Sequence, residues 1–126
     1  MPRVVVNCQN YMFSDMIRRT LRTGDFHVTV VDDPADVIGE FNNTAANIVL
    51  LEVTGSGPWT FSRRMELRKI IQRVDPDCKI VFMVDEKAEP EIADKIKQAK
   101  IDGLIDQFIY SSISAGYLKA VMETTV

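Results

Sequence analysis

A short apolar run of this sequence ends on an acidic side chain, and we expect any chemistry to centre on that side chain. Residues 47–51 lead into Glu52, and the turn-forming segment Thr54-Gly55-Ser56-Gly57-Pro58 follows. A short apolar run that turn residues close is typical of a strand buried on both faces. In a parallel sheet such a strand is central, and its carboxyl end opens into the ligand crevice. We therefore expect Glu52 to lie at the mouth of the site.

Polar side chains also follow the other apolar runs of the chain. These side chains are Cys8, Gln9, Asp85 and Gln107. Because the carboxyl ends of parallel strands meet at one edge of the sheet, we expect all four to lie around Glu52. Two neighbouring carboxylates, Glu52 and Asp85, could share a proton or hold a divalent ion. Two acids that simply point into water are the plainer interpretation.

Apolar periodicity predicts strands and helices in strict alternation. The expected strands are residues 4–6, 27–31, 47–52, 79–84 and 103–106. Capping residues and prolines mark helix starts at Asp33-Pro34 and Glu89-Pro90, and Gly24 marks a helix end. Such alternation predicts a parallel sheet with right-handed crossovers and helices on both faces. The expected fold is α/β, a doubly wound, flavodoxin-like sheet of five parallel strands in the order 2-1-3-4-5, formed by residues 1–126 as one domain.

Composition argues against several classes of function. The 126 residues are 46% hydrophobic and 26% charged, with a net charge of -3, as in ordinary globular proteins. A mildly acidic chain without a basic stripe is a poor candidate for binding nucleic acid. No apolar stretch approaches the length of a membrane span or of a signal-peptide core, so we expect a cytoplasmic protein. Cys8 and Cys78 should lie at opposite ends of parallel strands, too far apart for a disulfide.

Over nearly its whole length the chain resembles the receiver domain of bacterial two-component response regulators. The resemblance rests on residues 4–10, 47–52, 81–85 and 98–107, whose spacing fits without large insertions. It implies a site in which two acids hold Mg²⁺, an aspartate accepts a phosphoryl group, a hydroxyl group senses it and a lysine balances its charge. In this chain Cys8 and Gln9 occupy the acid pair, Glu52 the phosphoacceptor, Asp85 the hydroxyl and Gln107 the lysine position.

These replacements predict that the phosphorylation chemistry is lost. Mg²⁺ prefers carboxylates and water as ligands, so we expect no Mg²⁺ binding and no other cofactor. Without the metal, no cation stabilises the negative charge that develops during phosphoryl transfer. Cys8 lacks a base, because the only histidine, His27, should lie at the far end of its strand. We therefore predict a degenerate receiver, or pseudo-receiver, that signals by protein contact and is not an enzyme.

Other interpretations remain open. Glu52 could mimic a phosphorylated aspartate or be an ordinary solvated acid. The domain could still be regulated by two-component phosphorelay, or it could sense a small molecule or ion in the altered crevice. Trp59 could be an exposed contact residue or a packing residue at a helix start.

Apolar residues next to the last helix suggest a surface for a partner. Phe108, Ile109 and Tyr110 stand in a row before that helix, which carries Tyr117. In a loop, such a row is unusual unless it is covered. The residues either pack back on the domain or form a docking patch. The fifth strand and the last helices are also the surface that receivers commonly use, so we expect a protein partner or a second copy of the chain there.

Overall fold

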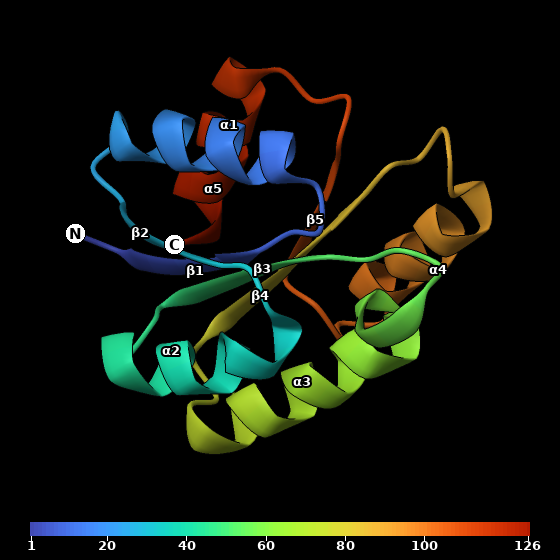
Figure 1. The fold of residues 1–126 in the computed structure, drawn as a ribbon, viewed down its shortest axis with the longest axis horizontal. Helices are drawn as coiled ribbons and strands as arrows, with labels where there is room; N and C mark the ends of the chain where they lie inside the picture. The colour runs from blue at the N-terminus through green and yellow to red at the C-terminus, as the bar shows by residue number, and fades with distance from the viewer.

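A computed structural model describes residues 1–126, whose five strands form one parallel sheet (Figure 1). The strands are β1 (Arg3–Asn7), β2 (His27–Val31), β3 (Ile48–Glu52), β4 (Lys79–Val84) and β5 (Gln107–Tyr110). Their order is β2-β1-β3-β4-β5, and every neighbouring pair is parallel. The doubly wound α/β fold that the sequence predicts is therefore confirmed.

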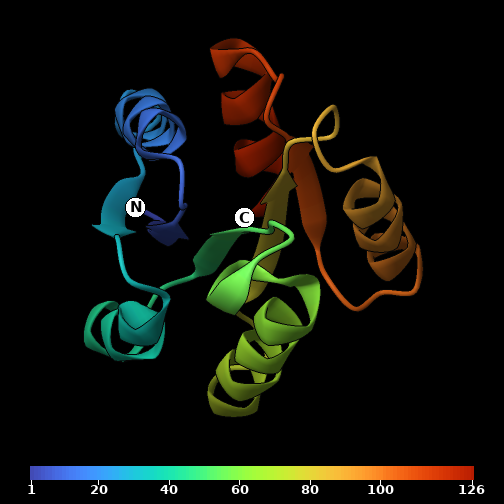
Figure 2. The same cartoon turned by 45° about the vertical axis from the view of Figure 1, so that its right-hand side comes forward.

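Helices cover both faces of this sheet. They are α1 (Tyr11–Arg22), α2 (Val37–Thr44), α3 (Phe61–Val74), α4 (Pro90–Ile101) and α5 (Ala115–Thr125). Figures 1 and 2 show α1 and α5 together on one face, and α2, α3 and α4 on the other. No helix is both long enough and apolar enough to span a membrane.

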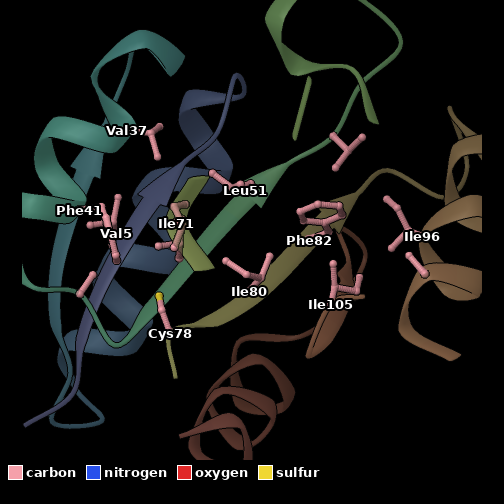
Figure 3. Packing of buried hydrophobic residues seen from close by; sticks show 14 of the residues in the cluster. Val5, Val37, Phe41, Leu51, Ile71, Cys78, Ile80, Phe82, Ile96 and Ile105 are labelled. Atoms are coloured by element: carbon pink, nitrogen blue, oxygen red, sulfur yellow. The ribbon is translucent and has the colours of Figure 1, made fainter. Parts of the chain in front are cut away.

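The core consists of two apolar layers, one on each face of the sheet. Successive side chains of a strand point to opposite faces, so Val5 and Leu51 pack with α2, α3 and α4 (Figure 3), whereas Val4 and Leu50 pack with α1 and α5. Every residue of β3 is buried. The continuous apolar run before Glu52 thus reflects a central strand with helices on both faces.

Side-chain caps or a proline stand at the starts of α1, α4 and α5 and of the short turn before α2. The Asn10 side chain accepts hydrogen bonds from the first turn of α1, Asp33 caps the short turn before α2, and Ser114 caps α5. Pro90 occupies the first turn of α4, where its missing N–H costs nothing. Glu89 precedes it without making a side-chain cap.

The predicted position of the fifth strand was wrong. β5 is Gln107–Tyr110, not residues 103–106, and it pairs with residues 81–84 of β4. Gly103, with φ of 75°, turns the chain just after α4, a conformation that glycine adopts readily. Ile105 fills the core from the connection. Aromatic and β-branched residues favour strands, so the row that we expected in a loop forms β5 itself, and Ile109 is buried.

Candidate functional site

A hollow of about 420 Å³ opens at the carboxyl ends of β1, β3 and β4. Among the residues that line it are Gln9, Asn10, Glu52, Thr54, Asp85 and Glu89. Three of these side chains are acids, and no lysine or arginine lines the hollow. It lies where the strand order reverses, which is where ligands bind in open α/β sheets. We call this hollow the crevice.

Glu52 is buried in the wall of the crevice rather than solvated. It ends β3 and is 5% exposed. Its Oε1 accepts a hydrogen bond of 3.1 Å from the main-chain N–H of Asn10, and no lysine or arginine nitrogen lies within 4.0 Å of its carboxylate. Asn10 is the N-cap of α1, so the carboxylate faces the positive end of a helix dipole. That helix end stabilises a negative charge at this position.

Cys8 and Gln9 differ sharply in their surroundings. Cys8 is buried in the apolar layer under α1 and α5, whereas Gln9 is exposed at the rim. Burial raises the pKa of the Cys8 thiol far above its ordinary value; the nearby Glu52 raises it further and Arg64 opposes the rise. The nucleophilic and metal-binding form of cysteine is the thiolate. Cys8 is therefore a neutral packing residue at neutral pH, and it and Cys78 are both free thiols.

Asp85 lies in the crevice wall but its carboxylate is engaged by its own loop. Its Oδ1 accepts hydrogen bonds of 3.1 Å from the main-chain N–H groups of both Lys87 and Ala88. An aspartate in this arrangement stabilises a turn. Asp85 and Glu52 thus face the same hollow from neighbouring strands, each with an oxygen already bound to the main chain.

Gln107 does not lie in the crevice. It pairs with Val81, three residues before β4 ends at Val84. At about 3.3 Å per residue, Gln107 therefore lies about 10 Å from the edge of the crevice. Its Oε1 accepts a hydrogen bond from the N–H of Phe108. Ser111 follows β5 at the crevice edge, and its N–H donates to Val84 O at 2.9 Å. Because the fifth strand was predicted too early in the sequence, Gln107 was assigned to the lysine position several residues too early.

Arg64 is the site residue that sequence reasoning missed. It lies on α3, is 0% exposed, and donates from Nε to the main-chain oxygen of Glu52 at 2.8 Å. Its Nη2 donates to the main-chain oxygen of Asn7 at 3.3 Å. A sequence signal existed: Arg64 stands two helical turns before the buried Ile71, on the same stripe of α3.

Trp59 covers this guanidinium. The Arg64 Cζ atom lies 4.6 Å from the centre of the Trp59 ring, and Trp59 is buried. Of the two interpretations of Trp59, the packing residue is confirmed. Burial lowers the pKa of Arg64 to about 10, while the negative charge of the nearby Glu52 opposes that change. Arg64 therefore remains a buried cation at neutral pH.

Two buried polar atoms beside this cation lack a partner. They are Arg64 Nη1 and Asn7 Oδ1, whereas the Nδ2 of Asn7 donates to the main-chain oxygen of Val31 at 2.6 Å. Orphaned buried groups are rare in folded proteins because each carries a desolvation cost.

These residues do not fit Mg²⁺, the metal that the fold would imply. Octahedral Mg²⁺ needs oxygen ligands, mainly carboxylates and water. A protonated Cys8 thiol offers none, and the Asp85 and Glu52 carboxylates each bind main-chain N–H groups. No group of three or more His, Cys, Asp or Glu side chains is arranged to hold a metal ion.

A second hollow, of about 380 Å³, lies along β5 and α5. The residues of the expected partner surface, Phe108, Ile109, Tyr110 and Tyr117, all line it. Tyr117 is 63% exposed, and the rings of Phe108 and Tyr110 lie 5.4 Å apart. β5 is an edge strand, so its outer side has no strand partner. The residues thus both pack on the domain and border an open, largely apolar hollow, which we call the β5–α5 surface.

Comparison with known proteins agrees with the doubly wound fold described above. No family model and no curated protein matches the sequence. Among solved structures, a response regulator from Burkholderia multivorans matches with a TM-score of 0.71 and 19% identity, over 98% of this chain and 94% of that chain. The chemotaxis protein CheY4 of Vibrio cholerae matches with a TM-score of 0.79 and 12% identity, over 100% and 99%.

A longer protein contains the same fold in part of its chain. NtrX from Brucella abortus matches with a TM-score of 0.80 and 18% identity, over 99% of this chain and 27% of NtrX. The chain therefore has the CheY-like receiver fold. At these identities the similarity extends to the fold, and function has to be argued from the site.

Proposed function

We propose that this chain is an atypical response-regulator receiver domain that signals in the cytoplasm by protein–protein contact, without aspartyl phosphorylation. The observation that carries the proposal is the content of the crevice. A buried glutamate bound to Asn10 ends β3, a neutral thiol follows β1, and a buried arginine lies beneath both. What supports a signalling role is the receiver fold over the whole chain.

Phosphoryl transfer would find little help in this crevice. The reaction depends on a positioned nucleophile and on cations that neutralise charge on the transferred group. Glu52 is fixed to the N-terminus of α1, and the acids that line the crevice would repel a phosphate. The same carboxyl group places an acid in the crevice that no kinase has to supply.

In this proposal the partner binds to the β5–α5 surface. Tyr117 supplies an exposed aromatic ring, and Phe108 and Tyr110 border the adjacent hollow. Aromatic residues of this kind often anchor protein interfaces. The occupant is another protein or a second copy of the chain. Catalysis forms no part of the proposal, because Cys8 is neutral and has no neighbouring base.

Treatment with acetyl phosphate tests this function directly. The protein would be incubated with acetyl phosphate and Mg²⁺, beside a phosphorylatable receiver as a positive control, and its intact mass measured. We expect the control to gain a phosphoryl group and this chain to gain none. A label on the wild type that disappears in Glu52→Gln would refute the proposal and establish conventional phosphorelay.

Small-molecule sensing is the second candidate, and the place of the crevice favours it, because ligands of open α/β sheets bind where the strand order reverses. A thermal-shift screen of nucleotides, metabolites and divalent ions would support it if one compound raised the melting temperature in the wild type and not in Glu52→Gln. Tryptophan fluorescence provides an independent readout, because Trp59 contacts the cation beneath the crevice.

A further inference from the structure

A positive charge is built into the protein directly beneath the crevice. Arg64 is completely buried, and its guanidinium reaches the ends of both central strands. We propose that Arg64 is the resident cation of this crevice: it joins the carboxyl ends of β1 and β3, so that the crevice keeps one conformation without a metal ion. This role deepens the proposed function. It rests on one part of that proposal, namely that phosphorylation does not switch the domain.

The first support is the pair of oxygens that Arg64 binds. Nε donates to Glu52 O at 2.8 Å, and Nη2 donates to Asn7 O at 3.3 Å. Glu52 and Asn7 are the last residues of β3 and β1, where the hydrogen-bond ladder between the strands ends. One planar guanidinium therefore continues the connection between the two strands beyond the ladder. A lysine ammonium, a point charge on a flexible chain, does not reproduce this fork.

The second support is the enclosure of the guanidinium by the loop after β3. Trp59 lies over it at 4.6 Å, in the geometry of a cation–π interaction. The N–H of Thr54 donates to Trp59 O at 2.9 Å, which closes the loop. The loop that borders the crevice is therefore held in place by the same cation that joins the strands.

The third support is electrostatic. A buried charge persists only where hydrogen bonds and neighbouring charges compensate its desolvation. Arg64 has two main-chain carbonyls and an aromatic face, with Glu52 as the nearby acid. It makes no ion pair within 4.0 Å. Arg64 therefore acts on the Glu52 carboxylate through the local field and on the strand ends through direct hydrogen bonds.

Melting of variants in EDTA, without a phosphodonor, tests this role. Arg63 is the matched control, because it is exposed and stands next to Arg64 on the same helix. We expect Arg63→Ala to melt within a degree or two of the wild type. Arg64→Ala should melt roughly 8–15 °C lower, and Arg64→Lys should recover only part of the loss. The wild type should melt at the same temperature with EDTA and with millimolar Mg²⁺.

Chemical rescue separates a role of the cation from simple filling of space. Ethylguanidinium at low millimolar concentration should raise the melting temperature of Arg64→Ala and restore the emission spectrum of Trp59. Urea at the same concentration should do neither. Arg64→Met, which keeps much of the volume without the charge, should also melt below the wild type and show altered Trp59 emission.

Any of three results would overturn this role. The first is an Arg64→Met variant with wild-type stability and Trp59 emission. The second is an Arg64→Ala variant that melts at the same temperature as Arg63→Ala. The third is an Arg64→Ala variant that ethylguanidinium fails to rescue. Phosphorylation of Glu52 would instead refute the proposed function, and it is measured in a separate assay, so the two failures can be told apart.

Discussion

Glu52 and Arg64 meet through the main chain and not through their charged groups. Arg64 Nε donates to the carbonyl oxygen of Glu52 at 2.8 Å, while the Glu52 carboxylate accepts from the N–H of Asn10 at 3.1 Å. The side chain of Glu52 thus faces α1, and Arg64 approaches from α3 on the other side of the sheet. The two charges influence each other across the end of β3 without forming an ion pair.

This arrangement predicts that Glu52→Gln is mild and Glu52→Ala is not. An amide oxygen can still accept from the Asn10 N–H, and the carbonyl that Arg64 binds is unchanged. We expect Glu52→Gln to change the free energy of unfolding by about 1 kcal/mol or less, and Glu52→Ala to lower it by about 1–3 kcal/mol. Urea denaturation measures both. Equal destabilisation by the two substitutions would contradict the assignment.

The cap of α1 should also be measurable. Asn10 Oδ1 accepts from the N–H groups of Met12 and Phe13, at 2.9 Å and 3.3 Å. Asn10→Ala should therefore lower the free energy of unfolding by about 1 kcal/mol. Asn10→Asp keeps an accepting oxygen but adds a negative charge beside Glu52, so it serves as the control for charge. An Asn10→Ala variant as stable as the wild type would argue against the cap.

Stability should fall above pH 9 because two buried thiols resist ionisation. Burial, followed by the negative charges of Asp75 and Asp106, raises the pKa of Cys78 from 9.0 to about 12, and Cys8 shifts in the same direction. Above pH 9.0 the unfolded chain loses protons that the folded protein keeps. Each thiol's contribution is therefore complete below pH 9 and is lost as the pH rises towards the folded pKa.

The magnitude is up to about 1.4 kcal/mol per pH unit for each thiol. The pKa of Arg64 is lowered to about 10, so above pH 10 this group makes the free energy of unfolding rise with pH, against the effect of the thiols. The effect of the thiols is therefore measured between pH 9 and pH 10. Urea denaturation across this interval should give a shallower slope for Cys8→Ala and for Cys78→Ala than for the wild type. Identical slopes in all three proteins would show that the thiols ionise normally.

Disruption of the β5–α5 surface should weaken association without weakening the fold. Tyr117 is 63% exposed, so Tyr117→Glu should change the free energy of unfolding by less than about 0.5 kcal/mol. Sedimentation and pull-down from native extract should both show reduced association. Tyr11, 74% exposed on α1, is the matched control, and Tyr11→Glu should leave association unchanged. Equal effects of the two substitutions would remove the β5–α5 surface from the proposal.

The fold and the centre of the site could be predicted from local patterns. A continuous apolar run predicts a strand with both faces covered, and strict alternation predicts parallel order, because both follow from short-range periodicity. The position of Glu52 at the crevice follows from them directly. The predicted cap at Asp33 is equally local, since its side chain binds the main-chain N–H of Ala35, two residues away.

Tertiary structure decided the fifth strand and the cation. Residues 103–106 and 107–110 are both apolar enough for a strand, and only pairing with β4 selects the second segment, which removes Gln107 from the crevice. Arg64 resembles its exposed neighbour Arg63 in sequence. It is buried because two carbonyls at separate strand ends and one indole ring converge on it. Helical spacing from Ile71 places Arg64 on the buried stripe of α3. It does not specify the hydrogen-bond partners, because these lie 12 and 57 residues away along the chain.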